Sequence, residues 1–240
     1  MPSVIWSEMG TEAQHNDVVL LARNLSKSYR SGKMDLEVLR GVGLQIFRGE
    51  TVAITGASGV GKSTLLHILG TLDRPTSGDL EIQSVDVLNL GEEELAGFRN
   101  RHIGFVFQFH NLLPEFTALE NVMMPGLIAD ESASALGEEA GFLLDRVGLG
   151  ARLHHRPGEM SGGECQRVAV ARALIRKPQV VLADEPSGNL DDRASRSLHE
   201  LIRELAAEEQ ETFIVMTHDR EFAASLDRTG HIEAGVLHLN

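Results

Sequence analysis

The chain has 240 residues, 42% of them hydrophobic and 24% charged, which is ordinary for a folded globular protein. Its formal net charge of −13 and the lack of a basic stripe argue against a nucleic-acid-binding surface. We expect no signal peptide and no membrane helix, since no stretch approaches ~20 apolar residues. The single cysteine, Cys165, excludes an internal disulfide and is typical of a reducing compartment.

The N-terminal portion predicts a tail followed by antiparallel β structure. Residues 1–17 lack any periodicity and are expected to form a flexible tail. The apolar and alternating patterns that follow predict four short strands, at residues 18–22, 24–29, 36–39 and 44–47. Turns are expected at Ser31-Gly32-Lys33 and at Arg48-Gly49-Glu50.

The next stretch, Gly56-Ala-Ser-Gly-Val-Gly-Lys-Ser-Thr64, matches the phosphate-binding pattern G-x-x-x-x-G-K-[ST]. An apolar strand at residues 51–55 precedes it, and a helix at 63–69 follows, as the pattern requires. Glycines let the backbone turn its N–H groups toward an anion, and the helix start adds its positive dipole end. A chance glycine-rich turn is the alternative to a nucleoside triphosphate site. The predicted nucleotide contacts here are Gly56, Ala57, Ser58, Gly59, Val60, Gly61, Lys62, Ser63 and Thr64.

Lys62 and Ser63 have separate predicted tasks within this stretch. The Lys62 ammonium would contact the β- and γ-phosphates as a compact charge. The Ser63 hydroxyl would be a ligand of Mg²⁺.

After this helix the pattern predicts alternating strands and helices, except in a segment that follows Gln108. We expect a strand at 79–83, a helix at 92–101 and a strand at 103–107 that ends at Gln108. Pro114, Pro125 and Gly126 predict that the following segment is irregular and partly exposed. Helical pattern returns over residues 132–147 and again before Lys177-Pro178, so residues from about 109 to 177 predict an inserted helical subdomain.

In the C-terminal third, the pattern predicts a strand at 179–183, a helix at 194–207 and a strand at 212–217. A short helix after Asp219 and a hairpin at 230–239 are expected to follow. The first strand ends in Asp184 and Glu185, which would lie at the edge of the sheet beside the phosphate loop. Asp184 would then bind Mg²⁺ through water, and Glu185 would accept a proton from the attacking water. The alternative is that both carboxylates only cap the next turn.

Ser161-Gly162-Gly163 precedes a helix and forms a second possible anion-binding helix start. One nucleotide could use both helix starts only from opposite sides, which implies two chains facing each other. A glycine-rich helix cap without a ligand is the alternative.

These features have the order and approximate spacing of the ATPase subunits of ABC transporters, which the chain resembles over about residues 20–239. The motifs that carry the resemblance are the phosphate loop, Gln108, Met160-Ser-Gly-Gly-Glu164, Asp184-Glu185-Pro186, Ser187-Gly-Asn-Leu-Asp191 and His218. The resemblance implies an α/β P-loop NTPase fold over residues 18–240, with a RecA-like core, an N-terminal antiparallel β-subdomain and an inserted α-helical subdomain.

The resemblance also implies residue roles. Tyr29 would stack on adenine, although a half-buried strand tyrosine is the alternative. Gln108 would touch Mg²⁺ and sense a membrane partner. Ser161, Gly162 and Gly163 would bind the γ-phosphate held by a second protomer, and Asp191 would bridge that homodimer. His218, otherwise interpreted as a core or capping histidine, would position the γ-phosphate and water. The implied catalytic residues are Glu185, His218 and Lys62, and the implied metal ligands are Ser63, Gln108 and Asp184.

Three positions depart from the family pattern. Met160 replaces the usual leucine with little change in volume, and Ser187 keeps the hydroxyl of the commoner threonine. Cys165 stands where a polar or basic residue is usual. A helix start could lower the pKa of its thiol and make it reactive, or it could be a plain small helix residue.

Within the family, residues 65–73 and 108–122 resemble ATPases of lipoprotein-releasing systems, whose near relatives are macrolide-export and cell-division ATPases. This implies ATP and Mg²⁺ as cofactors, permease partners of the LolC and LolE kind, and a peripheral place at the cytoplasmic face of the bacterial inner membrane. Phe109, Leu112, Leu113 and Phe116 would then form an apolar patch for the membrane partner, or else belong to the subdomain core.

Two other classes of function remain open. The same ATP-driven dimer could signal through a membrane partner to cell-wall enzymes without transporting anything. A soluble ATPase acting on DNA or ribosomes is disfavoured by the single ATPase unit, the acidic charge and the lack of a long coiled coil.

Overall fold

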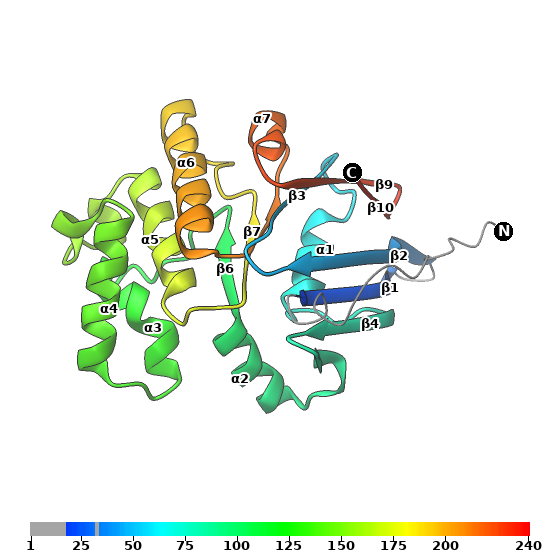
Figure 1. Cartoon of the computed structure of the whole chain (residues 1–240), viewed down its shortest axis with the longest axis horizontal. Coiled ribbons are helices and arrows are strands. Elements are labelled where there is room, and N and C mark those ends of the chain that lie inside the picture. The colour runs from blue at the N-terminus through cyan, green and yellow to red at the C-terminus, as the bar shows by residue number, and fades with distance from the viewer. Residues whose placement is uncertain (1–17, 32–33) are drawn as a thin grey trace.

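The structure, a computed structural model, describes residues 18–31 and 34–240. The predicted tail at 1–17 and the turn residues Gly32 and Lys33 lie outside the described residues. Two β-sheets and their helices form the described part, and Figure 1 shows helices α3, α4 and α5 at one end and strands β1, β2 and β4 at the other. The arrangement confirms the predicted α/β class.

The first sheet is antiparallel and comes from the N-terminal portion, as predicted. In the order β2-β1-β4-β5, its strands are β1 (Val18–Ser31), β2 (Met34–Phe47), β4 (Ser77–Ile82) and β5 (Val85–Asp86). The prediction of four short strands over residues 18–47 is wrong, because β1 and β2 are each continuous. The pairing register shifts between Ala22 and Leu25, where Asn24 has a φ of +51°. Such a bulge bends a strand without ending it.

The second sheet is largely parallel and has the order β10-β9-β3-β8-β7-β6. Only the hairpin β9–β10 is antiparallel, which confirms the hairpin predicted at 230–239. The parallel strands share one carboxyl edge, where the predicted site residues come together. The six strands are β3 (Thr51–Gly56), β6 (Ile103–Phe107), β7 (Val180–Asp184), β8 (Phe213–Met216), β9 (Arg228–Glu233) and β10 (Val236–Leu239).

Seven α-helices and three 3₁₀ turns connect these strands in the described part of the chain. None of the described helices combines the length and the apolar character needed to cross a membrane. The α-helices are α1 (Lys62–Leu69), α2 (Glu92–His102), α3 (Ala118–Ile128), α4 (Ala133–Arg146), α5 (Gly162–Leu174), α6 (Asp192–Glu209) and α7 (Arg220–Ala224). The 3₁₀ turns are η2 (Val87–Asn89), η3 (Gly150–Arg152) and η4 (Pro157–Glu159).

Helix α3 corrects the expectation of an irregular segment after Gln108. Thr117 caps this helix, since its hydroxyl accepts from Glu120 N–H at 3.2 Å and Glu120 Oε2 accepts from Thr117 N–H at 2.8 Å. Pro125 lies within the helix, and its carbonyl accepts a hydrogen bond from the Asn100 side chain. The capping box and packing against α4 and α5 therefore outweigh the helix-breaking tendency of proline.

The parallel sheet is buried on both faces. In β3, Val52 and Ile54 join the hydrophobic cluster on the side of the antiparallel sheet and α1, whereas Ala53 joins the cluster on the side of α3 to α6. Alternation of this kind follows from the two-residue period of a strand. The sheet is therefore a rigid platform for the loops at its carboxyl edge.

Gly104 in β6 allows α5 to pack closely on the sheet, because a Cβ at this position would lie 2.5 Å from the carbonyl oxygen of Ala173. We predict that Gly104→Ala lowers the free energy of unfolding by about 1–3 kcal/mol through overpacking. Gly97→Ala is the matched control, since Gly97 lies in α2 with no atom within 4 Å of the added Cβ. It should raise that free energy by about 0.5–1 kcal/mol. Urea unfolding followed by circular dichroism measures both, and equal stability of the two variants would contradict this packing.

Candidate nucleotide-binding site

The predicted phosphate loop connects β3 to α1 as the sequence pattern requires. Gly56, Gly59 and Gly61 have φ angles of +153°, +76° and +114°, which residues with a Cβ rarely adopt. A Cβ on Gly61 would also lie 3.1 Å from the carbonyl oxygen of Val38. Backbone conformation therefore favours glycine at all three positions, and close packing adds to this at Gly56 and Gly61.

Lys62 lies over the loop with its ammonium group turned inward. The residue is only 9% exposed, and its Nζ donates to the carbonyl oxygens of Gly56 at 2.8 Å and Ala57 at 3.3 Å. Its Nζ also lies 3.6 Å from Glu185 Oε1. A buried ammonium with a single carboxylate partner at this distance can attract the negative charge of a phosphate.

Glu185 joins the loop to His218. Its Oε2 lies 2.8 Å from His218 Nδ1 and accepts from His218 N–H at 3.2 Å. The residue follows β7 with a φ of +46°, and its N–H donates to Met216 O in the neighbouring strand β8. This left-handed conformation turns Glu185 toward the loop, so that one carboxylate faces both Lys62 and His218.

A hollow of about 580 Å³ opens above the phosphate loop. Its walls come from the phosphate loop, from β2, from the residues that follow β6 and β7, and from the segment after β8. Its lining residues are Val38, Ser58, Gly59, Gly61, Lys62, Ser63, Thr64, Gln108, Glu185 and His218.

Asp184, the last residue of β7, has the properties of a metal ligand. Burial raises the pKa of its carboxyl group, the hydrogen bond from the Ser63 side chain lowers it, and the charge of Glu185 raises it. Its Oδ1 is buried without a hydrogen-bond partner. A cation would satisfy this oxygen, and the donor set of a carboxylate, a hydroxyl and the Gln108 amide suits Mg²⁺.

Protein side chains alone do not enclose a metal here. Within residues 18–31 and 34–240, no three His, Cys, Asp or Glu side chains gather closely enough to hold an ion. Mg²⁺ commonly uses one or two carboxylates together with substrate phosphates, so the residues present fit a metal that binds with the nucleotide.

Gln108 lies at the rim of the hollow and pairs with Asn189. Gln108 Nε2 donates to Asn189 Oδ1, and Asn189 Nδ2 donates to Gln108 O, both at 3.1 Å. Gln166 on α5 donates to Phe107 O at 2.8 Å, and Arg172 donates to the carbonyl oxygens of His110 and Asn111. Two side chains of α5 therefore hold the segment around Gln108 through hydrogen bonds to its backbone carbonyl oxygens.

Tyr29 lies beside the phosphate loop but does not line the hollow. Its side chain is hydrogen-bonded to that of Thr64, and its hydroxyl donates to Asp73 Oδ2 at 2.8 Å. Lys27 Nζ lies 4.8 Å from the centre of its ring and 2.7 Å from Asp73 Oδ1. With 40% exposure, the tyrosine is positioned by these partners and keeps part of its ring accessible to a base.

The two remaining motifs do not line the hollow. The hydroxyl of exposed Ser161 donates to Glu164 Oε2 and accepts from Glu164 N–H, which caps α5. Asp191 is likewise an exposed cap, since its Oδ1 accepts from Ala194 N–H at 2.8 Å. Neither motif is among the residues lining the hollow of the same chain. The chain thus unites the phosphate loop with Gln108, Glu185 and His218, but not with Ser161-Gly162-Gly163 or Asp191.

The predicted apolar patch divides in two. Phe109, Leu113 and Phe116 are 70%, 41% and 38% exposed, whereas Leu112 is buried at 7% and belongs to the core of the helical region. For Leu112 the alternative of a place in the subdomain core therefore holds, because its side chain belongs to the same hydrophobic cluster as residues of α3, α4 and α5.

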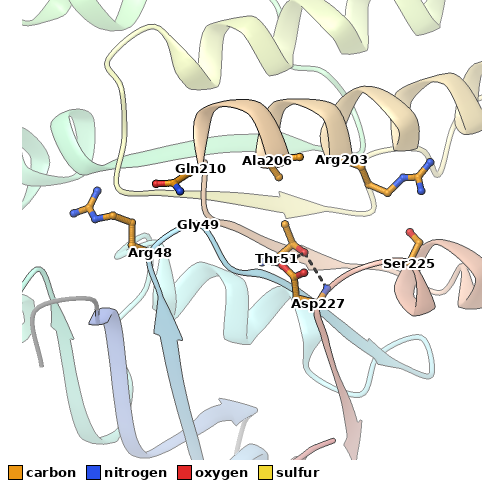
Figure 2. A pocket seen from close by; sticks show the side chains of 9 residues that line it. Arg48, Gly49, Thr51, Arg203, Ala206, Gln210, Ser225 and Asp227 are labelled. Atoms are coloured by element: carbon orange, nitrogen blue, oxygen red, sulfur yellow. Dashed lines mark hydrogen bonds between the residues drawn. The ribbon is translucent and has the colours of Figure 1, made fainter. Parts of the chain in front are cut away.

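A second hollow, of about 530 Å³, lies at the opposite edge of the parallel sheet, between the start of β3 and the end of α6. Figure 2 shows Arg48 and Arg203 at its two ends and the hydrogen-bonded pair Thr51 and Asp227 at its floor. None of the predicted site residues lines it. This hollow therefore lacks the residues that a nucleotide site would need.

Some residues of the site were missed from the sequence. Val38 lies in no motif, and Asn189 lies within Ser187-Gly-Asn-Leu-Asp191 but was given no role; both reach the site through tertiary contacts. Asp73, which holds Tyr29, ends the segment of residues 65–73 quoted above for the family resemblance, and that was the one available signal.

Cys165 is a buried helix residue. Its Sγ lies 3.5 Å from Pro157 O, and burial followed by the charge of Glu164 raises the pKa of its thiol. Of the two alternatives for Cys165, the structure therefore favours a plain small helix residue over a reactive thiol.

Comparison with known proteins adds a family and close relatives. The profile of the ABC transporter family matches residues 39–188. The lipoprotein-releasing system ATP-binding protein LolD of Shewanella oneidensis is 52% identical over 221 residues, which are 92% of this chain and 96% of the relative. The protein of the same name from Myxococcus xanthus is 52% identical over 217 residues, 90% of this chain and 97% of the relative.

Solved structures agree with this match. The dimeric post-hydrolysis state of the ATP-binding cassette MJ0796, bound to ADP and Pi, superimposes with a TM-score of 0.84 at 37% identity. The comparison covers 92% of this chain and 97% of the other. CbiO1 from Clostridium perfringens, part of the transporter complex CbiONQ, gives a TM-score of 0.82 at 26% identity, covering 93% and 88%. The predicted P-loop fold is thus confirmed.

The burial of Cys165 predicts low thiol reactivity in the folded chain. Because the raised pKa leaves less thiolate at a given pH, labelling by a water-soluble disulfide reagent at pH 8 should be at least about tenfold slower than after unfolding. A control variant carrying Gly158→Cys and Cys165→Ala places a thiol on the exposed 3₁₀ turn η4, where an added Cβ meets no atom within 4 Å. Equal labelling rates for this control and the wild type would show that Cys165 is accessible.

Proposed function

This chain belongs to the ABC transporter family, and on that premise we propose that it is the ATPase subunit of a lipoprotein-releasing transporter in a bacterial inner membrane. The observation that carries the ATPase assignment is the position of Glu185 between Lys62 and His218 at the phosphate loop. Lipoprotein is proposed as the transported substrate because two relatives that are about half identical to this chain are named for lipoprotein release.

The nucleotide is ATP, bound by the backbone N–H groups of the phosphate loop and by Lys62. Tyr29 contacts the adenine at the rim. Mg²⁺, held by Ser63, Asp184 and Gln108, supplies positive charge to the β- and γ-phosphates when bound.

Hydrolysis requires a water in line with the γ-phosphate. Glu185 accepts a proton from that water at a carboxylate oxygen, while His218 orients the water and the phosphate. Lys62 stabilises the negative charge that develops on the γ-phosphate oxygens. The contact between Glu185 and His218 holds both groups in position before the nucleotide arrives.

A second copy completes the site. Ser161, Gly162 and Gly163 do not line the hollow of their own chain. They bind the γ-phosphate held by the partner copy. Asp191 bridges the two copies. Closure excludes water, and loss of the γ-phosphate after hydrolysis removes the ligand that joins the two faces.

The membrane partner is an integral permease subunit. The exposed side chains Phe109, Leu113 and Phe116 provide an apolar surface for it directly after Gln108. Docking there would place the ATPase at the cytoplasmic face of the membrane without a membrane span of its own.

Isolation of the intact complex tests this proposal. A tagged chain extracted from membranes should retain integral permease subunits and bound lipoprotein. After reconstitution into vesicles, ATP should release the lipoprotein to a soluble acceptor. Two outcomes would contradict the assignment to lipoprotein release. In one, the complex retains permeases but exports a small amphipathic drug; in the other, it transports nothing and activates a cell-wall enzyme.

Removing the charge of Glu185 should stop hydrolysis without stopping binding. We predict that Glu185→Gln lowers kcat by about 10²–10⁴-fold, because an amide cannot accept the proton of water. The variant should accumulate as an ATP-bound dimer, which size-exclusion chromatography measures. Glu93→Gln, on the exposed face of α2, is the charge-matched control and should hydrolyse ATP normally. Turnover of Glu185→Gln at the wild-type rate would exclude Glu185 as the base.

Lys62 should contribute to nucleotide binding itself. We predict that Lys62→Ala weakens ATP binding at least about tenfold, because the buried ammonium no longer faces the phosphates. Fluorescence titration with a labelled ATP analogue measures the loss. Lys177→Ala is the control, since this side chain is 77% exposed and far along the chain from the loop. Unchanged affinity in Lys62→Ala would overturn the role given to Lys62.

A further inference from the structure

His199 is a buried imidazole that the proposed mechanism does not use. It lies on α6, is 9% exposed, and its Nε2 lies 2.8 Å from the hydroxyl oxygen of Ser187. Its ring stacks on that of Phe222, with 3.7 Å between ring centres and 3° between ring planes. His199 thus contacts two segments that are separate in the chain.

The first contact leads to Glu185. Ser187 follows Glu185 by two residues, in the loop that ends at Asp191. Within this loop, Gly188 N–H donates to Glu185 O at 2.9 Å, and Leu190 N–H donates to Ser187 O at 3.0 Å. The Ser187 hydroxyl connects this loop to α6 through His199, and the Ser187 carbonyl accepts a longer bond, of 3.4 Å, from Ser195 Oγ on the same helix.

The second contact leads to His218. Phe222 N–H donates to Asp219 Oδ1 at 2.9 Å, and Asp219 directly follows His218. The Phe222 ring, 3% exposed, therefore positions the start of α7 against α6. The Glu185 and His218 side chains then meet at 2.8 Å.

We propose that His199 is a positioning residue for ATP hydrolysis, because its hydrogen bond to Ser187 and its stacking on Phe222 set the loop of Glu185 against the segment of His218. This inference rests on the proposed ATPase function, and it assigns His199 no contact with the nucleotide. Loss of the Ser187 hydrogen bond to His199 loosens the Glu185 loop, which keeps its contacts to Ser195 and Gln108, while the phosphate loop keeps its own contacts.

The surroundings of His199 favour a neutral ring. Burial lowers the pKa of His199, with the Asp219 carboxylate on one side raising it and the Arg203 guanidinium on α6 lowering it. A neutral imidazole can donate or accept at Nε2, and the serine hydroxyl can take the complementary role. The contact therefore persists in either direction of the hydrogen bond.

Two substitutions separate the hydrogen bond from the stacking. His199→Phe keeps an aromatic ring against Phe222 but removes the nitrogen that faces Ser187. His199→Gln removes the ring but offers an amide at a similar distance from the backbone. Ser187→Ala removes the hydroxyl and leaves His199 in place, whereas Ser187→Thr restores a hydroxyl.

The experiment measures steady-state ATP hydrolysis by the full chain, with melting temperature as a control for folding. His199→Phe and Ser187→Ala should each lower kcat about three- to tenfold with less than about a twofold change in KM for ATP. The kcat of the double variant should be no lower than that of the less active single variant, since both changes break the same contact. Ser187→Thr should retain at least about half of the wild-type kcat. His199→Gln should lower kcat as well, because it gives up the stacking on Phe222.

A purely structural histidine gives a different pattern. Lower melting temperatures with unchanged kcat in the folded fraction would overturn the inference, and so would losses that multiply in the double variant. Wild-type kcat in His199→Phe, with a loss only in His199→Gln, would assign the residue to packing alone. A wild-type chain that binds but never hydrolyses ATP would overturn the proposed function itself, which separates the two failures.

Discussion

The Glu185 carboxylate is the interaction on which the rest of the nucleotide site depends. One oxygen lies 3.6 Å from the Lys62 ammonium and the other 2.8 Å from His218 Nδ1, so a single side chain joins three segments of the chain. This is possible only because β3, β7 and β8 run parallel and end at the same edge. The left-handed backbone of Glu185 is an uncommon conformation for a residue other than glycine, and such strain is concentrated at functional sites.

Division of the motifs between two regions has a physical reason. The phosphate loop leaves its backbone N–H groups open, whereas Ser161 and Asp191 already use their side-chain oxygens to cap their own helices. A capped helix start still carries a positive dipole, and Gly162 leaves it exposed. An anion from outside the chain can therefore approach it, and a nucleotide bound to a second copy meets this requirement.

Sequence patterns predicted what short-range chemistry determines. The phosphate loop and the carboxylates that follow β7 depend on a few adjacent residues, and they lie where expected. Pro125 and its neighbours predict an irregular segment where α3 lies, because they say nothing of the capping box at Thr117 or of the packing that stabilises the helix. The exposure of Phe109 and the burial of Leu112 could not be told apart, since both are apolar and only the packed helices distinguish them. Contacts between distant segments, such as Gln108 with Asn189, leave no local pattern.

The loop between Glu185 and Asp191 is held from two sides by weak contacts. Asn189 pairs with Gln108, which directly precedes the exposed Phe109, and Ser187 pairs with His199. A hydrogen bond between neutral groups contributes only about 0.5–1.5 kcal/mol, far less than the buried strands on either side. Asn189 thus links the segment that carries Phe109 to the loop that carries Glu185. Lys62, in contrast, is held by carbonyl oxygens of the phosphate loop itself. Different contacts therefore position the two charged groups of the site.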